Sequence, residues 1–369
     1  MRAYSIFSGH GSTAKRHGWM VSVCKISVYA CCLSAGIVFA QSDKQQEVEF
    51  VANVSGVGTS AAAFLEIGVG ARAMAMGGAY GAVANDASAL YWNPAGIAWV
   101  NSVQCELMHN KWLVDTYHDF VGVVMPVPSL RSSFGLSYCS LGYGEEQVRT
   151  VERPEGTGET FTGRDVAVAL SYGIAFTDRF SFGISGKYIS QRIWSETGSA
   201  MAVDIGVFYN TMLKGLRIGA CVSNFGTKIE MRGRHIRTIV DPDEGVENYD
   251  RVPVNYKTGQ FSLPLLFRVG ISYERQLGQF GQVLLATDVN HPSFATESIN
   301  LGMEYGFANM FYLRAGYENL FERDNINGLT LGGGLEYYRR GRMGFRIDYA
   351  WADWGVFDNA QRFSLGLIF

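Results

Sequence analysis

The chain has 369 residues and a formal net charge of −3, with 44 glycines, 13% aromatic residues and only 18% charged residues. Ordinary proteins contain roughly 7% glycine and about 25% charged residues. This composition excludes a disordered, collagen-like or coiled-coil chain, and the charge excludes a broad nucleic-acid interface, so we expect no nucleic-acid partner.

Residues 1–40 have the features of an export signal. A basic stretch precedes an apolar run that ends on Ala40 and is followed by polar residues. After Lys25 only about 15 largely apolar residues remain, fewer than the roughly 20 that a membrane-spanning helix needs. We predict a signal peptide that is cleaved after Ala40, with Met1 or Met20 as the start.

Residues 60–100 differ from the rest of the chain because small side chains dominate them. The stretch 60–68 is short and helix-prone. Asn93-Pro94-Ala95-Gly96 predicts a turn, since asparagine bonds to nearby backbone and proline restricts φ. The segment is too poor in large apolar side chains to build a core of its own. Its isolated charges are Glu66, Arg72 and Asp86.

From about residue 102 to the C-terminus, the hydropathy pattern has a period of two. In 166–176, large residues such as Val168, Leu170 and Tyr172 alternate with alanine, serine and glycine. Such alternation is typical of a strand with two different faces. It predicts 14 strands, at 102–111, 117–126, 132–141, 165–177, 179–192, 200–210, 215–225, 264–275, 280–290, 297–307, 310–319, 327–338, 343–352 and 361–369.

The connections between these strands alternate between short turns and longer loops, and the longest loops are 142–164 and 226–263. An even strand number with short turns on one side and long loops on the other is the layout of a bacterial outer-membrane barrel. The final strand also ends on an aromatic residue, Phe369. The sequence therefore predicts an all-β, transmembrane antiparallel β-barrel over 101–369.

The two strand faces indicate what each side of the barrel wall contacts. A soluble β protein would expose lysine, glutamate and threonine, whereas here the face opposite the large apolar residues carries glycine, alanine, serine and scattered charges. We therefore expect the large apolar face to meet outer-membrane lipid and the small face to line a crowded lumen. The charges on the small face are Lys187, Asp204, Arg268, Glu304, Arg314, Glu336, Arg346 and Asp348.

A lumen of small side chains suits the small-residue segment that precedes the barrel. We predict that residues 60–100 form a lumenal plug, or hatch, and that residues 41–59 form a periplasmic N-terminal tail. Glycine and alanine on both surfaces would allow the plug backbone to approach the wall closely.

The sequence GARAMAMGGAYGAVANDASALYWNPAGIA, at residues 70–98, resembles the N-terminal signature of the PorV/PorQ family of outer-membrane barrels. That family is similar to the FadL-like long-chain fatty-acid transporters. The resemblance implies a lumenal plug at 60–100 and a role beside the type IX secretion system, while no motif in the chain predicts a cofactor. The plug-motif residues that it implies are Gly70, Arg72, Gly77, Gly78, Asp86, Ser88, Asn93, Pro94 and Ala95.

Two functions follow from this resemblance. In the first, the barrel is not an enzyme and binds secretion-system subunits, or the C-terminal signal domains of secreted cargo, through the external loops 142–164 and 226–263. In the second, it is a FadL-like passive channel for long-chain fatty acids or other hydrophobic small molecules. An open diffusion porin is disfavoured, because it needs a polar, water-filled lumen.

Other motifs indicate neither catalysis nor a bound metal. Gly68–Ala73 fits a relaxed dinucleotide pattern but lacks the surrounding strand–helix–strand unit. The histidines are scattered, and the three cysteines beyond the signal form no paired motif. Four tryptophans near predicted strand ends suggest the aromatic girdle of a membrane barrel: Trp112, Trp194, Trp351 and Trp354.

Overall fold

The computed structural model describes residues 58–240, 252–278, 281–322, 325–338, 343–357 and 359–369. The described residues form one compact unit. The predicted signal peptide with its cleavage site, and residues 41–57 of the predicted tail, lie outside the described residues, so these remain predictions.

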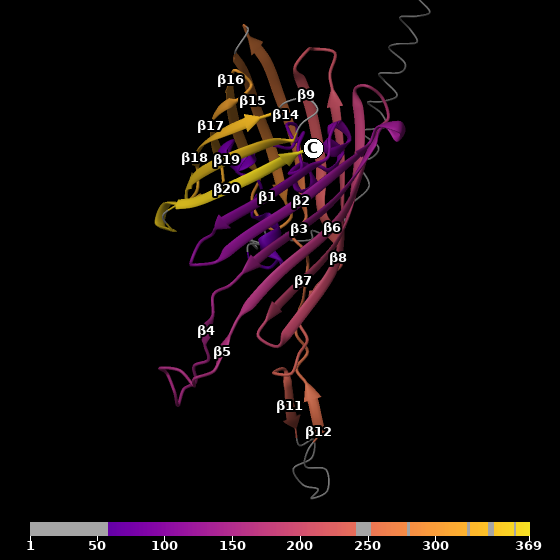
Figure 1. Cartoon of the computed structure of the whole chain (residues 1–369). Helices are drawn as coiled ribbons and strands as arrows, with labels where there is room; N and C mark the ends of the chain where they lie inside the picture. The colour runs from indigo at the N-terminus through magenta and orange to yellow at the C-terminus, as the bar shows by residue number, and fades with distance from the viewer. Residues whose placement is uncertain (1–57, 241–251, 279–280, 323–324, 339–342, 358) are drawn as a thin grey trace, which may run out of the picture. The chain divides into compact units, whose positions relative to one another are not determined.

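Fourteen antiparallel strands close into a barrel, in which β1 pairs with both β2 and β20 (Figure 1). This confirms the predicted fold class and strand number. The barrel strands are β1 (Gln104–Lys111), β2 (Tyr117–Val127), β3 (Ser132–Gly142), β6 (Gly163–Ala175), β7 (Phe180–Ile193), β8 (Glu196–Asn210), β9 (Leu216–Gly226), β14 (Leu266–Leu277), β15 (Gly281–Pro292), β16 (Ser298–Phe307), β17 (Phe311–Leu320), β18 (Leu329–Tyr337), β19 (Gly344–Asp353) and β20 (Asn359–Ile368).

We call the end of the barrel where β1 begins and β20 finishes the turn end, and the opposite end the loop end. Two loop-end connections carry additional short hairpins. These comprise β4 (Glu146–Gln147) with β5 (Thr160–Phe161), β10 (Ile229–Glu230) with β13 (Gln260–Phe261), and β11 (Arg237–Val240) with β12 (Val252–Asn255). One loop-end connection is shorter than the predicted strand bounds imply. Only Trp194 and Ser195 separate β7 from β8, with Trp194 at a positive φ of 53°.

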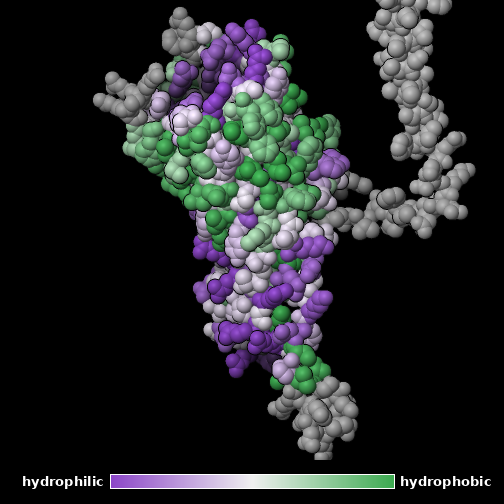
Figure 2. All heavy atoms as spheres, turned by 90° about the vertical axis from the view of Figure 1, so that its right-hand side faces the viewer, coloured by the Kyte–Doolittle hydropathy of each residue, from purple (hydrophilic) through white to green (hydrophobic). Residues whose placement is uncertain are grey.

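The two faces of the wall have the predicted polarity. Along β6, Val168 and Leu170 are exposed while Ala167, Ala169 and Ser171 are buried. Figure 2 shows hydrophobic side chains gathered in a band across the visible face, with hydrophilic residues above and below it. A wall that is apolar outward and small or polar inward suits a barrel whose outer surface contacts lipid.

The residues before β1 form short helical pieces, of which most side chains are buried. They are η1 (Ala63–Glu66), α2 (Ala71–Ala75), α3 (Ala89–Trp92) and η2 (Pro94–Trp99), and two further 3-10 turns lie between barrel strands, η3 (Pro128–Leu130) and η4 (Gly355–Phe357). No helix in the described part of the chain is long and apolar enough to cross a membrane.

This N-terminal segment, residues 59–100, contacts the small-residue face of strands around the barrel. Helix η2 contacts β6, β7 and β8, whereas α2 contacts β17, β18 and β19. Two wall glycines mark the closest approaches. A Cβ at Gly206 on β8 would lie 2.1 Å from Oδ1 of Asn93, and a Cβ at Gly316 on β17 would lie 2.1 Å from the backbone nitrogen of Gly77. The wall therefore requires glycine at these contacts.

We predict that valine at Gly183 destabilises the protein by about 1–3 kcal/mol, the usual cost of overpacking. A Cβ there would lie 2.2 Å from the carbonyl carbon of Pro94. Gly186, on the same strand, has no atom near its Cβ position, so Gly186→Val is the matched control. The measurement is the denaturant midpoint of the purified barrel in detergent. Equal midpoints for the two variants would contradict close contact at Gly183.

Candidate functional site

Buried charged side chains connect the N-terminal segment to the barrel wall. Arg72 follows the start of α2 and donates two hydrogen bonds to Glu304 on β16, from Nε at 2.9 Å and from Nη2 at 2.8 Å. Glu304 also accepts a hydrogen bond of 2.6 Å from Nε of Arg314 on β17. Because Arg72 and Arg314 share one carboxylate, α2 is joined to two neighbouring strands.

Asp86 forms a second connection of the same kind. Its carboxylate accepts hydrogen bonds from the Tyr80 hydroxyl at 2.7 Å and the Ser88 hydroxyl at 2.6 Å. It also lies 3.0 Å from Nη2 of Arg346 on β19 and 3.3 Å from Nη1 of Arg72. Burial opposes ionisation, but Arg346 and Arg72 hold the pKa of Asp86 well below its usual range. The ionised Asp86 carboxylate therefore stabilises the folded protein at pH values above the usual pKa of an aspartate. This stabilisation is lost as the pH falls through the lowered pKa.

We call the connected charged residues of the segment and wall the charge network. Its wall members include Arg346, which lies 3.3 Å from Glu106 on β1 and 2.9 Å from Asp348 on β19. Among the described residues the network contains three arginines and four carboxylates: Arg72, Arg314, Arg346, Asp86, Glu106, Glu304 and Asp348.

The predicted motif glycines lie where the segment turns or meets the wall. Gly70, Gly77 and Gly78 all have positive φ, at 81°, 64° and 66°. At Gly77 a Cβ would lie 2.7 Å from the Leu301 carbonyl oxygen and from the Tyr317 backbone nitrogen. Glycine is therefore needed at position 77 both for its backbone conformation and for space.

Asn93, Pro94 and Ala95 begin η2 and join it to the wall. The Asn93 side chain accepts a hydrogen bond from the Ala95 nitrogen at 3.1 Å and donates to the carbonyls of Gly81 and Val207 at 3.0 and 3.1 Å. Pro94 occupies the start of the helix, where its missing N–H costs nothing. The Ala95 carbonyl accepts a hydrogen bond of 2.9 Å from the Ser181 hydroxyl on β7. The predicted turn is thus an N-cap.

The nine predicted motif residues all belong to the segment, but they do not form a single cluster. Arg72, Asp86 and Ser88 belong to one polar group, whereas Asn93–Ala95 contact β7 and β8 on another side. Glu106 belongs to the network without having been identified from the sequence. It is a lone carboxylate in β1, and only its inward position and its contact with Arg346 distinguish it.

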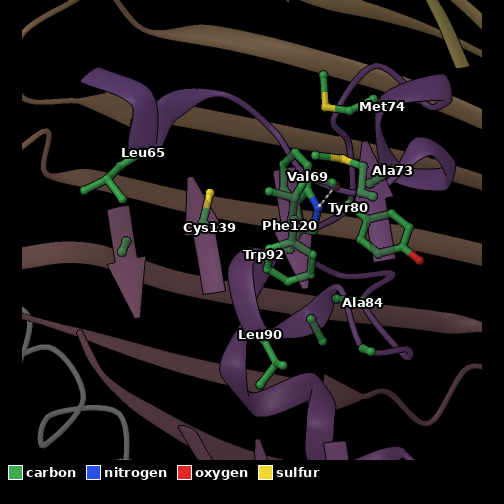
Figure 3. Packing of buried hydrophobic residues seen from close by; sticks show 14 of the residues in the cluster. Leu65, Val69, Ala73, Met74, Tyr80, Ala84, Leu90, Trp92, Phe120 and Cys139 are labelled. Carbon is green, nitrogen blue, oxygen red and sulfur yellow. Dashed lines mark hydrogen bonds between the residues drawn. The ribbon is translucent and has the colours of Figure 1, made fainter. Parts of the chain in front are cut away.

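The apolar side chains of the segment pack on one another and on the wall. Figure 3 shows Trp92 beside Val69, where Nε1 of Trp92 donates a 2.9 Å hydrogen bond to the Val69 carbonyl. Arg268 on β14 lies over the Trp92 ring, with its guanidinium carbon 4.6 Å from the ring centroid. The segment thus has a small mixed core that includes wall residues.

Cavities lie at both ends of the segment. The loop-end cavity, of about 330 Å³, is lined by residues that include Leu65, Glu66, Trp92, Trp112 and Arg362. Two turn-end cavities, of about 460 and 180 Å³, share Asn85, Arg217 and Glu336. No described residue lines both the loop-end cavity and a turn-end cavity.

Two of the four tryptophans predicted to belong to an aromatic girdle line the loop-end cavity instead, so the girdle prediction is corrected for these two. Trp112 and Trp354 contact each other edge to face at 4.7 Å between ring centroids, and both line the cavity. Position near a strand end is shared by girdle and cavity residues, so the strand pattern alone could not separate them.

The long connection between β9 and β14 is held against the neighbouring β7–β8 turn. The His235 ring stacks on Trp194 with centroids 3.8 Å apart, and its Nδ1 lies 2.6 Å from the Ser195 hydroxyl. Ile229 at the base of this connection is buried, and Arg232 pairs with Thr197 as an isolated bridge. In the described part of the chain, no group of three or more potential metal-binding side chains is present.

Beyond this base, β11 and β12 form a hairpin that projects from the loop end (Figure 1). Its apolar side chains are exposed, with Ile239 at 63% and the paired residues Val240 and Val252 at 43% and 42%. In Figure 2 a separate group of hydrophobic side chains lies below the hydrophilic region that borders the main band. The hairpin thus exposes apolar surface away from the lipid-facing band.

Comparison with known structures shows the same fold in transport proteins. The TodX deltaS2S3 mutant monoaromatic hydrocarbon channel has a TM-score of 0.51 and 12% identity, covering 82% of this chain and 98% of that one. The toluene transporters TodX of Pseudomonas putida and TbuX of Ralstonia pickettii each have a TM-score of 0.50 and 14% identity, covering 82% of this chain and 97% of theirs. At these identities the likeness shows the fold alone.

Comparison at the sequence level shows the family. No curated protein sequence matches the chain significantly. Residues 51–259, more than half of the chain, match the family described as "Type IX secretion system protein PorV". Together with the closed barrel, this match identifies an outer-membrane barrel. The chain therefore belongs to the PorV family of type IX secretion system proteins.

Proposed function

We propose that this protein is a non-catalytic outer-membrane barrel that holds secreted proteins, or subunits of the secretion machinery, at the cell surface. In this proposal the turn end faces the periplasm, and residues 60–100 act as the plug. The partners are secretion-system subunits and the C-terminal signal domains of cargo. The observation that carries the proposal is the anchored loop-end hairpin β11–β12, with exposed Ile239, Val240 and Val252.

An isolated two-stranded hairpin is marginally stable in water, and exposed apolar residues at the end of a projection gain stability when a partner covers them. The edges of β11 and β12 also offer backbone groups to which a partner strand could bind. The family match supports a secretion role, since it includes most of the β9–β14 connection. A protein partner suits this surface better than lipid, because hydrophilic residues separate it from the main apolar band (Figure 2).

We expect asparagine at both Val240 and Val252 to lower partner recovery from outer membranes by at least about tenfold, the effect of losing roughly 1.4 kcal/mol of binding energy. These two residues pair directly across the hairpin. The measurement is affinity purification of the tagged barrel, with quantification of the co-purifying secreted proteins and secretion subunits.

The matched control is asparagine at Met212 and Leu213, which are 80% and 67% exposed at the turn end. This control should recover partners normally, and all variants should keep the heat-dependent gel mobility of a folded barrel. Recovery of neither secretion subunits nor cargo with the unmodified protein would contradict the proposal.

A second candidate is a FadL-like passive channel for long-chain fatty acids or other hydrophobic small molecules. The apolar part of the loop-end cavity, with Leu65, Ile67 and Trp92, is the feature that favours it. The separate lining of the cavities at the two ends counts against a continuous path. Uptake of fatty acids and aromatic hydrocarbons in deletion and wild-type cells tests this candidate, and identical uptake would remove it.

A further inference from the structure

Arg362 is a buried cation, and two nitrogens of its guanidinium lack a hydrogen-bond partner among the described residues. The residue lies on β20, is 0% exposed and lines the loop-end cavity. In the part of the chain that the structure describes, neither Nη1 nor Nη2 has a hydrogen-bond partner. The guanidinium lies over the Trp112 ring, 5.0 Å from its centroid. A buried charge without compensation is costly, so these two nitrogens indicate an acceptor that the described residues do not supply.

A second unpartnered donor lies in the same corner of the cavity. Nε1 of Trp354 is buried without an acceptor, and the Trp354 ring contacts Trp112, on which Arg362 stacks. Glu318 interacts electrostatically with Arg362, yet within the described residues no ion pair or hydrogen bond joins them, and Oε1 of Glu318 also lacks a partner. The corner therefore offers three donor nitrogens and one acceptor oxygen.

The rest of the cavity is suited to an apolar group. Leu65, Ile67, Met74, Trp92 and Phe294 line it, and its volume of about 330 Å³ is at the lower end of the range for small-ligand sites. Thr296 and Glu66, both exposed, also line it, so the cavity communicates with solvent at the loop end. A ligand could thus enter with its apolar body against these walls and its polar end at Arg362.

Acidic residues restrict the charge of such a ligand. Glu66 and Glu322 line the cavity as well. These groups disfavour a multiply charged anion. A single carboxylate has two oxygens that can accept hydrogen bonds from Arg362 and Trp354, and a guanidinium pairs strongly with a carboxylate.

We propose that the loop-end cavity binds a carboxylate attached to an apolar body, and that its source is the chain-terminal carboxylate of a bound polypeptide. The choice of source rests on the proposed function, because a protein held at the loop end brings its terminus to this cavity. Capture of a terminal carboxylate is a recurring mode of peptide recognition. The unpartnered oxygen of Glu318 accepts a hydrogen bond from the backbone N–H of the final residues.

The test uses the full-length mature barrel in detergent and a fluorescein-labelled hexapeptide that ends in valine and phenylalanine. The peptide is made as the free acid and as the amide, and binding is measured by fluorescence anisotropy. We expect the amide to bind at least about tenfold more weakly than the acid, since hydrogen bonds to a charged group contribute roughly that factor. Arg362→Met should weaken binding of the peptide acid by the same factor and leave binding of the peptide amide unchanged.

Trp354→Phe should weaken binding of the acid by about threefold, which is the lower range for one hydrogen bond. The matched controls are Arg164→Met and Trp351→Phe, which change the same residue types outside the cavity. Arg362→Met should also keep the fold, because it removes a costly buried charge whose Nη1 and Nη2 make no hydrogen bond to the described residues. Equal binding of acid and amide, unchanged binding by Arg362→Met, or no binding to the unmodified barrel would each overturn the site.

Competition identifies the source of the carboxylate. If 3-phenylpropionate displaces the labelled peptide at the concentration at which the unlabelled peptide acid does, the free acid is the ligand and the polypeptide assignment is wrong. If the peptide acid does not bind but the barrel still recovers its partners, this inference alone is overturned. If the barrel recovers no partners but the peptide acid binds normally, the proposed docking function alone is contradicted.

Discussion

Replacement of Arg346 by methionine is expected to lower the free energy of unfolding by about 3–5 kcal/mol, the cost of breaking a buried ion pair from one side. Arg346 is only 7% exposed and lies within 3.3 Å of carboxylate oxygens of Asp86, Glu106 and Asp348. Without the guanidinium these three carboxylates would repel one another in a buried site. Denaturant titration in detergent, followed by the heat-dependent gel shift, measures the change.

Two further variants show whether the cause is charge. Arg164→Met removes an exposed arginine from β6 and should change the unfolding free energy by less than about 0.5 kcal/mol. Adding Glu106→Gln to Arg346→Met should restore part of the loss, because it removes one of the unpaired carboxylates. Unchanged stability of Arg346→Met would show that the charge network does not hold the segment to the wall.

Deletion of residues 60–100 is expected to convert a closed barrel into a conducting one. The segment contacts strands around the barrel, and the cavities at its two ends have no described lining residue in common. Its removal should leave a lumen lined by polar and small side chains, which water and ions can fill. Planar-bilayer recording of the purified protein is the measurement, with no stepwise conductance expected for the unmodified barrel.

A milder variant tests the plug even if the deletion variant does not fold. Asn93→Ala removes the hydrogen bonds to the Gly81 and Val207 carbonyls while the rest of the segment stays in place. It should produce brief openings in a barrel that still resists SDS before heating. If the unmodified protein conducts as strongly as the deletion variant, residues 60–100 are not a plug.

The strands could be predicted because their signal is local. Alternation of large and small residues, as in Val168–Ala169–Leu170, follows directly from the opposite directions of successive side chains. All 14 predicted strands are present, with boundaries displaced by a few residues. The largest displacement is at β8, which begins at Glu196 and not at 200. The first residues of β8 pair with β7, but they are polar and do not alternate with large apolar residues, so the hydropathy pattern does not mark them as strand.

The site was less predictable, because its contacts join residues far apart in the chain. Arg72 and Glu304 are separated by 232 residues, and Arg346 and Glu106 by 240. The sequence marked Glu304, Arg314 and Arg346 as charges on the small-residue face, but their partners depend on strand register. Trp112 and Trp354 meet only because closure of the barrel pairs β1 with β20, which in turn pairs with β19.

By itself, the sequence determined the membrane barrel, its strand number, the polarity of its wall and the family. The first three depend on period and composition, which each segment carries independently of the others, whereas the family rests on the resemblance of residues 70–98. The tertiary structure decided which charges pair and where the wall glycines contact the segment. It also decided which of the predicted girdle tryptophans line the loop-end cavity instead. Register and closure place residues from opposite ends of the chain within hydrogen-bond distance, and no local pattern records those distances.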